Sequence, residues 1–180
     1  SQNAVTNVVL NPIESVLTSA PWWLMVAVVA VAAWAISGSR AALISAACLG
    51  LIILLNLWNH SMVTLANVLV ATALTLVIGI ALGIATARNA RVRSLLRPLL
   101  DAAQTMPAFV YLIPAVALFL PSRFTAIVAA VIFAVPPVIR LVEVGILSVP
   151  SDAVEAAASS GATDRQMLFK VQLPMSRRTL

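Results

Sequence analysis

An unbroken apolar stretch over residues 62–87 limits what this chain can fold into more than any other feature. The stretch contains no charged side chain. A helix needs about 20 mostly apolar residues to cross a hydrocarbon core about 30 Å thick. Backbone groups surrounded by lipid must bond within their own segment, which a helix allows. The stretch therefore predicts a transmembrane helix.

Composition extends this conclusion from one segment to the whole chain. Hydrophobic residues make up 62% of the sequence and charged residues 9%, whereas a soluble domain carries about 25% charged residues. Most of the exterior must therefore face lipid. The net charge of +5 does not indicate nucleic-acid binding, because the basic residues form short clusters rather than a continuous stripe. With a single cysteine, Cys48, the chain has no internal disulfide.

Five segments are apolar enough to be predicted as transmembrane helices. The predicted fold class is all-α, a polytopic transmembrane helical bundle. The polar residues 1–21 before the first span are predicted to be an extracytoplasmic tail with one weakly amphipathic turn. The predicted spans are residues 22–36, 41–57, 62–87, 98–120 and 124–147.

The basic residues predict how these spans are oriented. Cytoplasmic loops carry an excess of Lys and Arg, so we place the basic loop 88–97 inside. Alternation then puts the N-terminus outside and the segment after the fifth span inside. Arg123 alone among these loop charges falls on the unfavoured side. The basic residues assigned to the cytoplasm are Arg40, Arg88, Arg91, Arg93, Arg97, Arg165, Lys170, Arg177 and Arg178.

Several residues inside the spans predict contacts or bends. Gly79 and Gly83 form a GxxxG spacing that permits close helix approach. It indicates internal packing or, as the less favoured alternative, a dimer interface. The proline pair at 136–137 predicts a kink in the fifth span. Arg140 and Glu143 follow at i,i+3 spacing and can pair with each other near the inner boundary.

The fourth span opens with polar residues that are candidates for a translocation pathway. An aspartate at a helix centre costs about 2.5–3.5 kcal/mol on insertion scales, so its face points toward protein or water rather than lipid. Local capping and interhelical bonding are the alternatives to a pathway. Pro107 and Pro114 predict interruptions, and broken helices often line a cavity. The candidate pathway residues are Asp101, Gln104, Thr105, Met106 and Pro107.

After residue 150 the chain turns polar and predicts two short helices joined at a glycine. Ser151 or Asp152 is the predicted N-cap of the first helix, which consists largely of small residues. Gly161 suits a helix end with positive φ. From these residues alone, an amphipathic interfacial loop is the alternative to a specific docking element.

The second short helix is predicted over residues 166–172. Thr163 and Asp164 precede it as predicted caps, and the Leu-Pro pair at 173–174 is predicted to end it. Its apolar side chains are Met167, Leu168, Phe169 and Val171.

This segment resembles the EAA loop of ABC importer permeases, written EAA-x3-G-x9-I-x-LP. The chain matches the pattern except for one mild change, valine in place of isoleucine. In that family the loop forms coupling helices that dock on the ATPase subunit. The resemblance implies an ATPase-coupling role for Glu155, Ala156, Ala157, Gly161, Val171, Leu173 and Pro174.

Residues 100–114 and 133–140 are similar to glycine betaine/proline betaine permeases of bacteria. The resemblance covers roughly residues 62–180 and implies a type I permease core, with the EAA loop over 150–175 and two accessory helices over 22–61. The family core has further spans after this loop, so the chain is expected to be incomplete at its C-terminus. Its implied substrate is a quaternary-amine osmolyte such as glycine betaine, proline betaine or choline.

The resemblance also implies partners and a location. A multi-pass protein of the bacterial inner membrane is expected, with membrane lipid around it and the EAA loop in the cytoplasm. Its expected partners are an ABC ATPase, an extracytoplasmic substrate-binding protein and a second permease copy forming a homodimer. ATP and Mg are expected on the ATPase alone, since the chain has no GxxxxGK[ST] motif and no cofactor or metal cluster of its own.

Other functions are weighed against this one. The EAA loop does not distinguish betaine from another small solute, such as an amino acid, a sulfonate or a phosphonate. A channel or an intramembrane enzyme is a further alternative. An enzyme needs converging titratable groups at depth, and the spans offer only Asp101 and the Arg140/Glu143 pair near one boundary. We therefore expect a transporter subunit without catalytic residues.

Overall fold

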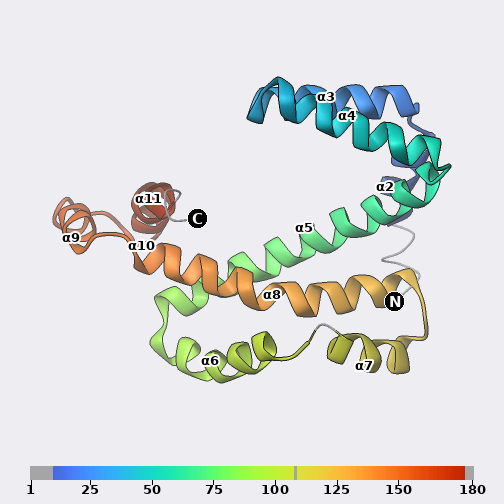
Figure 1. Cartoon of the computed structure of the whole chain (residues 1–180). Coiled ribbons are helices and arrows are strands. Elements are labelled where there is room, and N and C mark those ends of the chain that lie inside the picture. The colour runs from blue at the N-terminus through green and yellow to red at the C-terminus, as the bar shows by residue number, and fades with distance from the viewer. Residues whose placement is uncertain (1–9, 108, 177–180) are drawn as a thin grey trace. The chain divides into compact units, whose positions relative to one another are not determined.

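The computed structural model describes residues 10–107 and 109–176, and every regular element among them is a helix (Figure 1). This confirms the predicted all-α class. Two compact units divide the chain, Ser1–Val70 and Ala71–Leu180. The longest helix, α5, spans Trp58–Arg88 and contributes residues to both units.

The first unit consists of α2, α3, α4 and the beginning of α5. Helix α2 covers Asn11–Ser19, α3 covers Trp22–Ser37 and α4 covers Ser39–Leu54. Helices α3 and α4 lie side by side in Figure 1 and pack on each other along their length. Residues 11–19, where the sequence predicts a single weak turn, form a helix of 9 residues with proline in its first turn, a position that needs no N–H donor.

In the second unit, α6, α7 and the C-terminal α11 pack against the long helix α8. Helix α6 spans Ala90–Thr105, α7 spans Phe109–Phe119 and α8 spans Arg123–Leu147. The buried residues of α8 recur along its length and make it the centre of this unit. They are Thr125, Ile127, Ala129, Pro136, Ile139, Val142, Gly145 and Ile146.

The glycines of α5 allow its close approach to α8. A Cβ atom built on Gly79 would lie 2.6 Å from Val138 Cγ1, and one on Gly83 would lie 2.7 Å from Val142 Cβ. Both separations are shorter than any ordinary carbon–carbon contact. The GxxxG face is therefore occupied by α8, which confirms the predicted internal packing.

The beginning of the fourth predicted span differs from the sequence-based prediction. The basic segment predicted as a loop is helical, because Asn89 caps α6 by accepting from the backbone N–H groups of Arg91 and Val92 at 2.9 and 3.4 Å. The helix therefore begins at Ala90 rather than near Pro98, which lies inside it.

The prolines differ in their effect on the helices. The helical path ends at Thr105 and resumes at Phe109, so a break at Pro107 is confirmed. Pro114 lies inside α7, where the predicted interruption is wrong. The pair Pro136–Pro137 lies inside α8, which continues to Leu147; neighbouring helices can compensate for the lost backbone hydrogen bonds.

Two of the described helices, α5 and α8, are long and apolar enough to cross a membrane. The number rises to four among the described residues if each bent pair, α2 with α3 and α6 with α7, forms one span. The prediction of five spans is therefore not reached. The shortfall lies at α4, an apolar helix of 16 residues, since a perpendicular span needs about 20.

Candidate functional site

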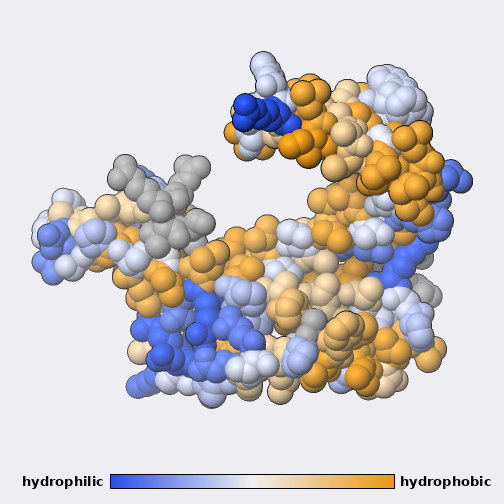
Figure 2. Space-filling model, viewed as in Figure 1, coloured by the Kyte–Doolittle hydropathy of each residue, from blue (hydrophilic) through white to orange (hydrophobic). Residues whose placement is uncertain are grey.

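The segment after α8 forms helices that expose polar and small side chains, and we call residues 151–176 the foot. It contains α9 (Ser151–Ser159), α10 (Asp164–Gln166), the π-helix η2 (Met167–Gln172) and α11 (Leu173–Ser176). Figure 2 shows hydrophilic surface over α9 and over α6, and apolar surface over much of the remaining visible face.

Helix α9 presents two of the three EAA side chains outward. Glu155 and Ala156 are exposed, whereas Ala157 is half-buried on the same side as Ala153 and Val154. This spacing places the half-buried residues on one helix face, and α9 packs against η2. Residue 150, a proline, is the N-cap and makes no side-chain bond. The predicted cap at Ser151 or Asp152 is therefore wrong, because both residues already belong to the helix.

Gly161 ends the first helix in the left-handed conformation, as predicted. Its φ is +77°, and nothing lies within 4 Å of a Cβ built on it. Its N–H donates to the Ala158 carbonyl at 2.9 Å, and the N–H of Ala162 donates to the Ala157 carbonyl at 3.1 Å. This is the pattern of a Schellman motif. Backbone conformation, not lack of space, therefore requires glycine here.

A capping box begins the second half of the foot. The Thr163 hydroxyl accepts from the Gln166 N–H at 3.4 Å, and Gln166 Oε1 accepts from the Thr163 N–H at 2.9 Å. The threonine cap is confirmed, whereas Asp164 is the first residue of α10. The predicted stop at Leu173–Pro174 is wrong, since both belong to α11. The helical path runs through this pair without a break, since Leu173 has helical φ and ψ of −63° and −44°.

Leu168 anchors the foot to the membrane helices. It is 4% exposed and packs with Val142 and Ile146 of α8. Partly buried Ile84, Ala87, Val138 and Leu173 surround this cluster. The sequence places Leu168 among several apolar neighbours without distinguishing it, because a π-turn changes which residues share a face.

The other predicted coupling residues in the second half lie near this anchor. Val171 and Leu173 are half-buried, and Pro174 is exposed. An ion pair of 3.3 Å between Arg88 Nη2 and Asp164 Oδ2 joins the foot to the end of α5 as well. Both of its side chains are substantially exposed.

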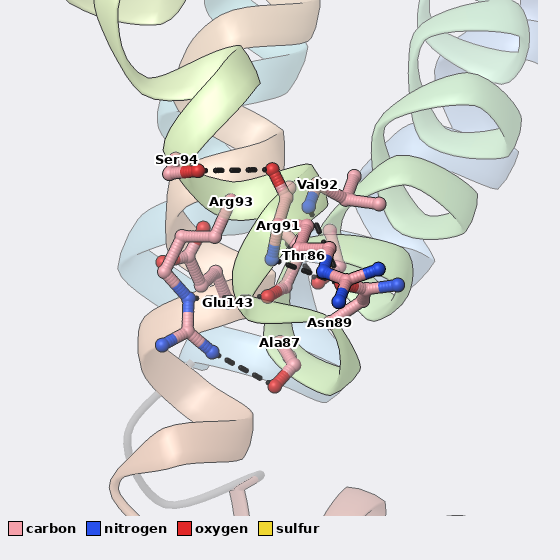
Figure 3. Close-up of polar contacts among 9 residues, drawn as sticks. Thr86, Ala87, Asn89, Arg91, Val92, Arg93, Ser94 and Glu143 are labelled. Atoms are coloured by element: carbon pink, nitrogen blue, oxygen red, sulfur yellow. Dashed lines mark hydrogen bonds and ion pairs between the residues drawn. The ribbon is translucent and has the colours of Figure 1, made fainter.

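Arg93 joins three helices at a single point (Figure 3). Its Nη2 donates to the Ala87 carbonyl at 2.9 Å, and its Nε lies 3.1 Å from the Thr86 carbonyl and 3.2 Å from Glu143 Oε1. The last carbonyls of a helix lack intrahelical partners, so a side chain of α6 completes the end of α5. The same guanidinium neutralises a carboxylate on α8.

A second ion pair joins α6 to α8 and involves a predicted pathway residue. Asp101 pairs with Arg140, so Arg140 and Glu143 each pair with α6 rather than with each other, contrary to the prediction. Interhelical bonding was one of the alternatives for Asp101. Arg93 and Glu143 of one pair and Arg140 of the other line an open groove of about 310 Å³, with Arg97 and Leu100 beside them.

The remaining pathway candidates lie at the break between α6 and α7. Gln104, Thr105, Met106 and Pro107 are exposed. Across this break the Tyr111 hydroxyl donates to the Ala103 carbonyl at 2.6 Å, so the two helices are linked. Within the described residues, no three His, Cys, Asp or Glu side chains gather to hold a metal ion.

Comparison with known proteins identifies the class of protein that has this architecture. The chain belongs to the family described as binding-protein-dependent transport system inner membrane component, which matches residues 75–180. It is thus a multi-pass inner-membrane component of a transport system. This confirms the resemblance to ABC importer permeases that the EAA motif indicated.

Individual relatives are permease proteins. The chain is 47% identical to the glycine betaine/proline betaine transport system permease protein ProW of Escherichia coli (strain K12), over 96% of this chain and 49% of that protein. It is 41% identical to the glycine betaine transport system permease protein OpuAB of Bacillus subtilis (strain 168), over 95% of this chain and 61% of that protein. The chain therefore spans about half to two thirds of the length of these relatives.

Proposed function

We propose that this chain is part of the permease subunit of an ATP-driven importer for a quaternary-amine osmolyte, such as glycine betaine, proline betaine or choline. The names of its relatives support this substrate class. The family match and the relatives' names also favour a membrane subunit over an enzyme.

The observation that carries the coupling role is the geometry of α9. It is a short helix of small side chains with no buried residue, held against η2 on one side and open on the other. Such a helix can insert into a groove of a partner. We propose that Glu155, Ala156, Ala157 and Gly161 shape a contact with an ATPase subunit, with Val171, Leu173 and Pro174 supporting it. ATP and Mg would bind to that subunit and not to this chain.

We further propose that the foot lies in the cytoplasm and the N-terminus outside. The ion pairs Arg88–Asp164 and Arg93–Glu143 support this orientation, because they hold two arginines of the basic cluster at the end of the bundle from which the foot emerges. Cytoplasmic segments are enriched in such residues. A substrate-binding protein would then dock on the opposite side, and a second permease copy would complete the transporter.

Cross-linking tests the coupling role. With Cys48 replaced by serine, a cysteine introduced as Ala156→Cys on α9 should cross-link to the ATPase subunit through a short bifunctional maleimide. Ile36→Cys on α3, at a side chain that is 84% exposed, is the control and should give no such product. An assembled transporter that never yields the α9 product, or a foot accessible only to reagents outside the cell, would contradict this function.

Uptake measurements test the substrate class. Another small solute is the second candidate, because the chain is 36% identical to the trimethylamine N-oxide transport system permease protein TmoV of Ruegeria pomeroyi over 96% of its length. We expect unlabelled proline betaine to compete with labelled glycine betaine for uptake. Stronger competition by trimethylamine N-oxide or taurine would favour the second candidate.

A further inference from the structure

We propose that Leu168 is a positioning residue, the side chain through which displacement of α9 reaches the membrane helices α5 and α8. The inference rests on the proposed coupling function and adds a route to it. The route begins at η2, against which α9 packs. No residue of α9 is itself buried, so this packing on η2 is the side-chain route by which its movement can be passed on.

Within η2, Leu168 provides the buried contact. Its side chain is 4% exposed, whereas that of the next residue, Phe169, is 63% exposed. Leu168 lies in one cluster with Val142 and Ile146 of α8, against which Ile84 of α5 also packs. A single side chain therefore touches the packed region where α5 and α8 meet.

That region transmits displacement because it is tightly packed. Val142, which clusters with Leu168, also faces Gly83 so closely that a Cβ there would lie 2.7 Å from Val142 Cβ. Packed interiors have low compressibility and pass strain to their neighbours. A movement of Leu168 would therefore shift α8 and α5 together.

The Arg88–Asp164 ion pair is a weaker candidate for this role. Its side chains are 40% and 92% exposed. Exposed ion pairs contribute little and are screened by salt, and long side chains absorb displacement by changing rotamer. Leu168 is the contact that cannot yield in this way.

The experiment compares Leu168→Ala with Ile127→Ala in the assembled transporter, reconstituted in vesicles with its ATPase and binding protein. Ile127 is 5% exposed and lies near the other end of α8, away from Leu168. Ile127→Ala therefore removes the same number of carbon atoms as Leu168→Ala, from a site that is equally buried but not part of the proposed route. The readout is ATP hydrolysed per solute imported. We expect this ratio to rise about five-fold or more for Leu168→Ala, within the usual range of coupling between sites, and to stay unchanged for Ile127→Ala.

An unchanged ratio for Leu168→Ala, or an equal rise for both variants, would overturn the proposal. If Leu168→Ala does not assemble, Leu168→Val removes less volume and decides by the same readout, with a smaller rise supporting the route and an unchanged ratio refuting it. Leu168→Met should restore the native ratio. The α9 cross-link to the ATPase is measured in the same variants. If the proposed coupling function is wrong, the cross-link is absent even when Leu168 is unchanged. If only the route through Leu168 is wrong, the cross-link forms and the ratio stays unchanged in Leu168→Ala.

Discussion

At the scale of single residues, Arg93 shows what a guanidinium can do that another cation cannot. It bonds two carbonyls of α5 and a carboxylate of α8 from a position on α6. A fork of fixed donors suits such divergent acceptors, whereas lysine presents one compact charge. Its side chain is 31% exposed and that of Glu143 is 18% exposed, so these contacts are partly shielded from water.

Replacing Arg93 by lysine should therefore lower stability although the charge is kept. At least one acceptor would lose its donor, which costs about 1–3 kcal/mol per group when it is buried. We expect a lower midpoint of heat denaturation for the purified protein in detergent. Arg97→Lys on the same helix is the matched control, because no described contact ties that exposed arginine to a carboxylate. Equal losses for the two variants would contradict the role given to Arg93.

Gly83 makes a second prediction at this scale. A methyl group here would meet Val142 Cβ at 2.7 Å and the Ile139 carbonyl oxygen at 3.0 Å. The backbone oxygen cannot move aside without shifting α8, and overpacking costs typically about 1–3 kcal/mol. We expect Gly83→Ala to lower the denaturation midpoint. Gly50→Ala, where nothing lies within 4 Å, should leave it unchanged or raise it. A neutral Gly83→Ala would mean that α5 and α8 are farther apart.

At the scale of elements, the turn between α9 and α10 depends on backbone conformation. Gly161 has space around it, so a substitution there acts through its φ of +77°. Left-handed backbone costs about 1–2 kcal/mol for most L-residues, and asparagine tolerates it better. We therefore expect Gly161→Asn to retain more solute uptake than Gly161→Val in the assembled transporter. Equal uptake by the two variants would show that the turn can reorganise without cost.

Locally determined features of the foot could be predicted from the sequence. The positive φ of Gly161 and the Thr163 cap follow from residues adjacent in the chain. The break at Pro107 and the close approach at the α5 glycines were predicted from residue type, but the same reasoning about proline failed at Pro114, which lies inside α7.

Features that depend on distant residues could not be predicted. The partners of Arg140 and Glu143 lie on another helix, and residues three apart on one helix suggested the wrong pairing. The burial of Leu168 depends on packing against α5 and α8. No periodicity within the foot reveals which of its apolar side chains is enclosed.

At the scale of the whole molecule, the boundary between the two compact units lies close to the start of the family match. The units meet between Val70 and Ala71, and the match begins at residue 75. The helices before α5 thus lie outside the matched region. This agrees with the prediction that residues 22–61 are accessory, which remains a prediction.

Deleting residues 1–57 tests that prediction. The deletion removes α2, α3 and α4 and ends before Trp58, so α5 stays whole. We expect the shortened chain still to insert into the membrane and to cross-link to the ATPase through α9. A deletion of residues 1–80 is the control, because it leaves only residues 81–88 of α5, too few to cross a membrane, and should abolish insertion of that helix. Loss of the cross-link in the shorter deletion would show that the first helices belong to the permease core.

The π-helix η2 also imposes a limit on chain length. Its turn holds one more residue than an α-helical turn, and it lies between Gly161 and the Leu173–Pro174 pair. The wider turn takes up this extra residue, so losing one residue here and returning to α-helix would leave everything beyond it in nearly the same phase relative to α9. Leu173 would then still border the Leu168 cluster. Losing a second residue has no such compensation and would rotate everything beyond it by about 100°. Deletion of one residue should therefore be tolerated in this stretch, whereas deletion of two should not.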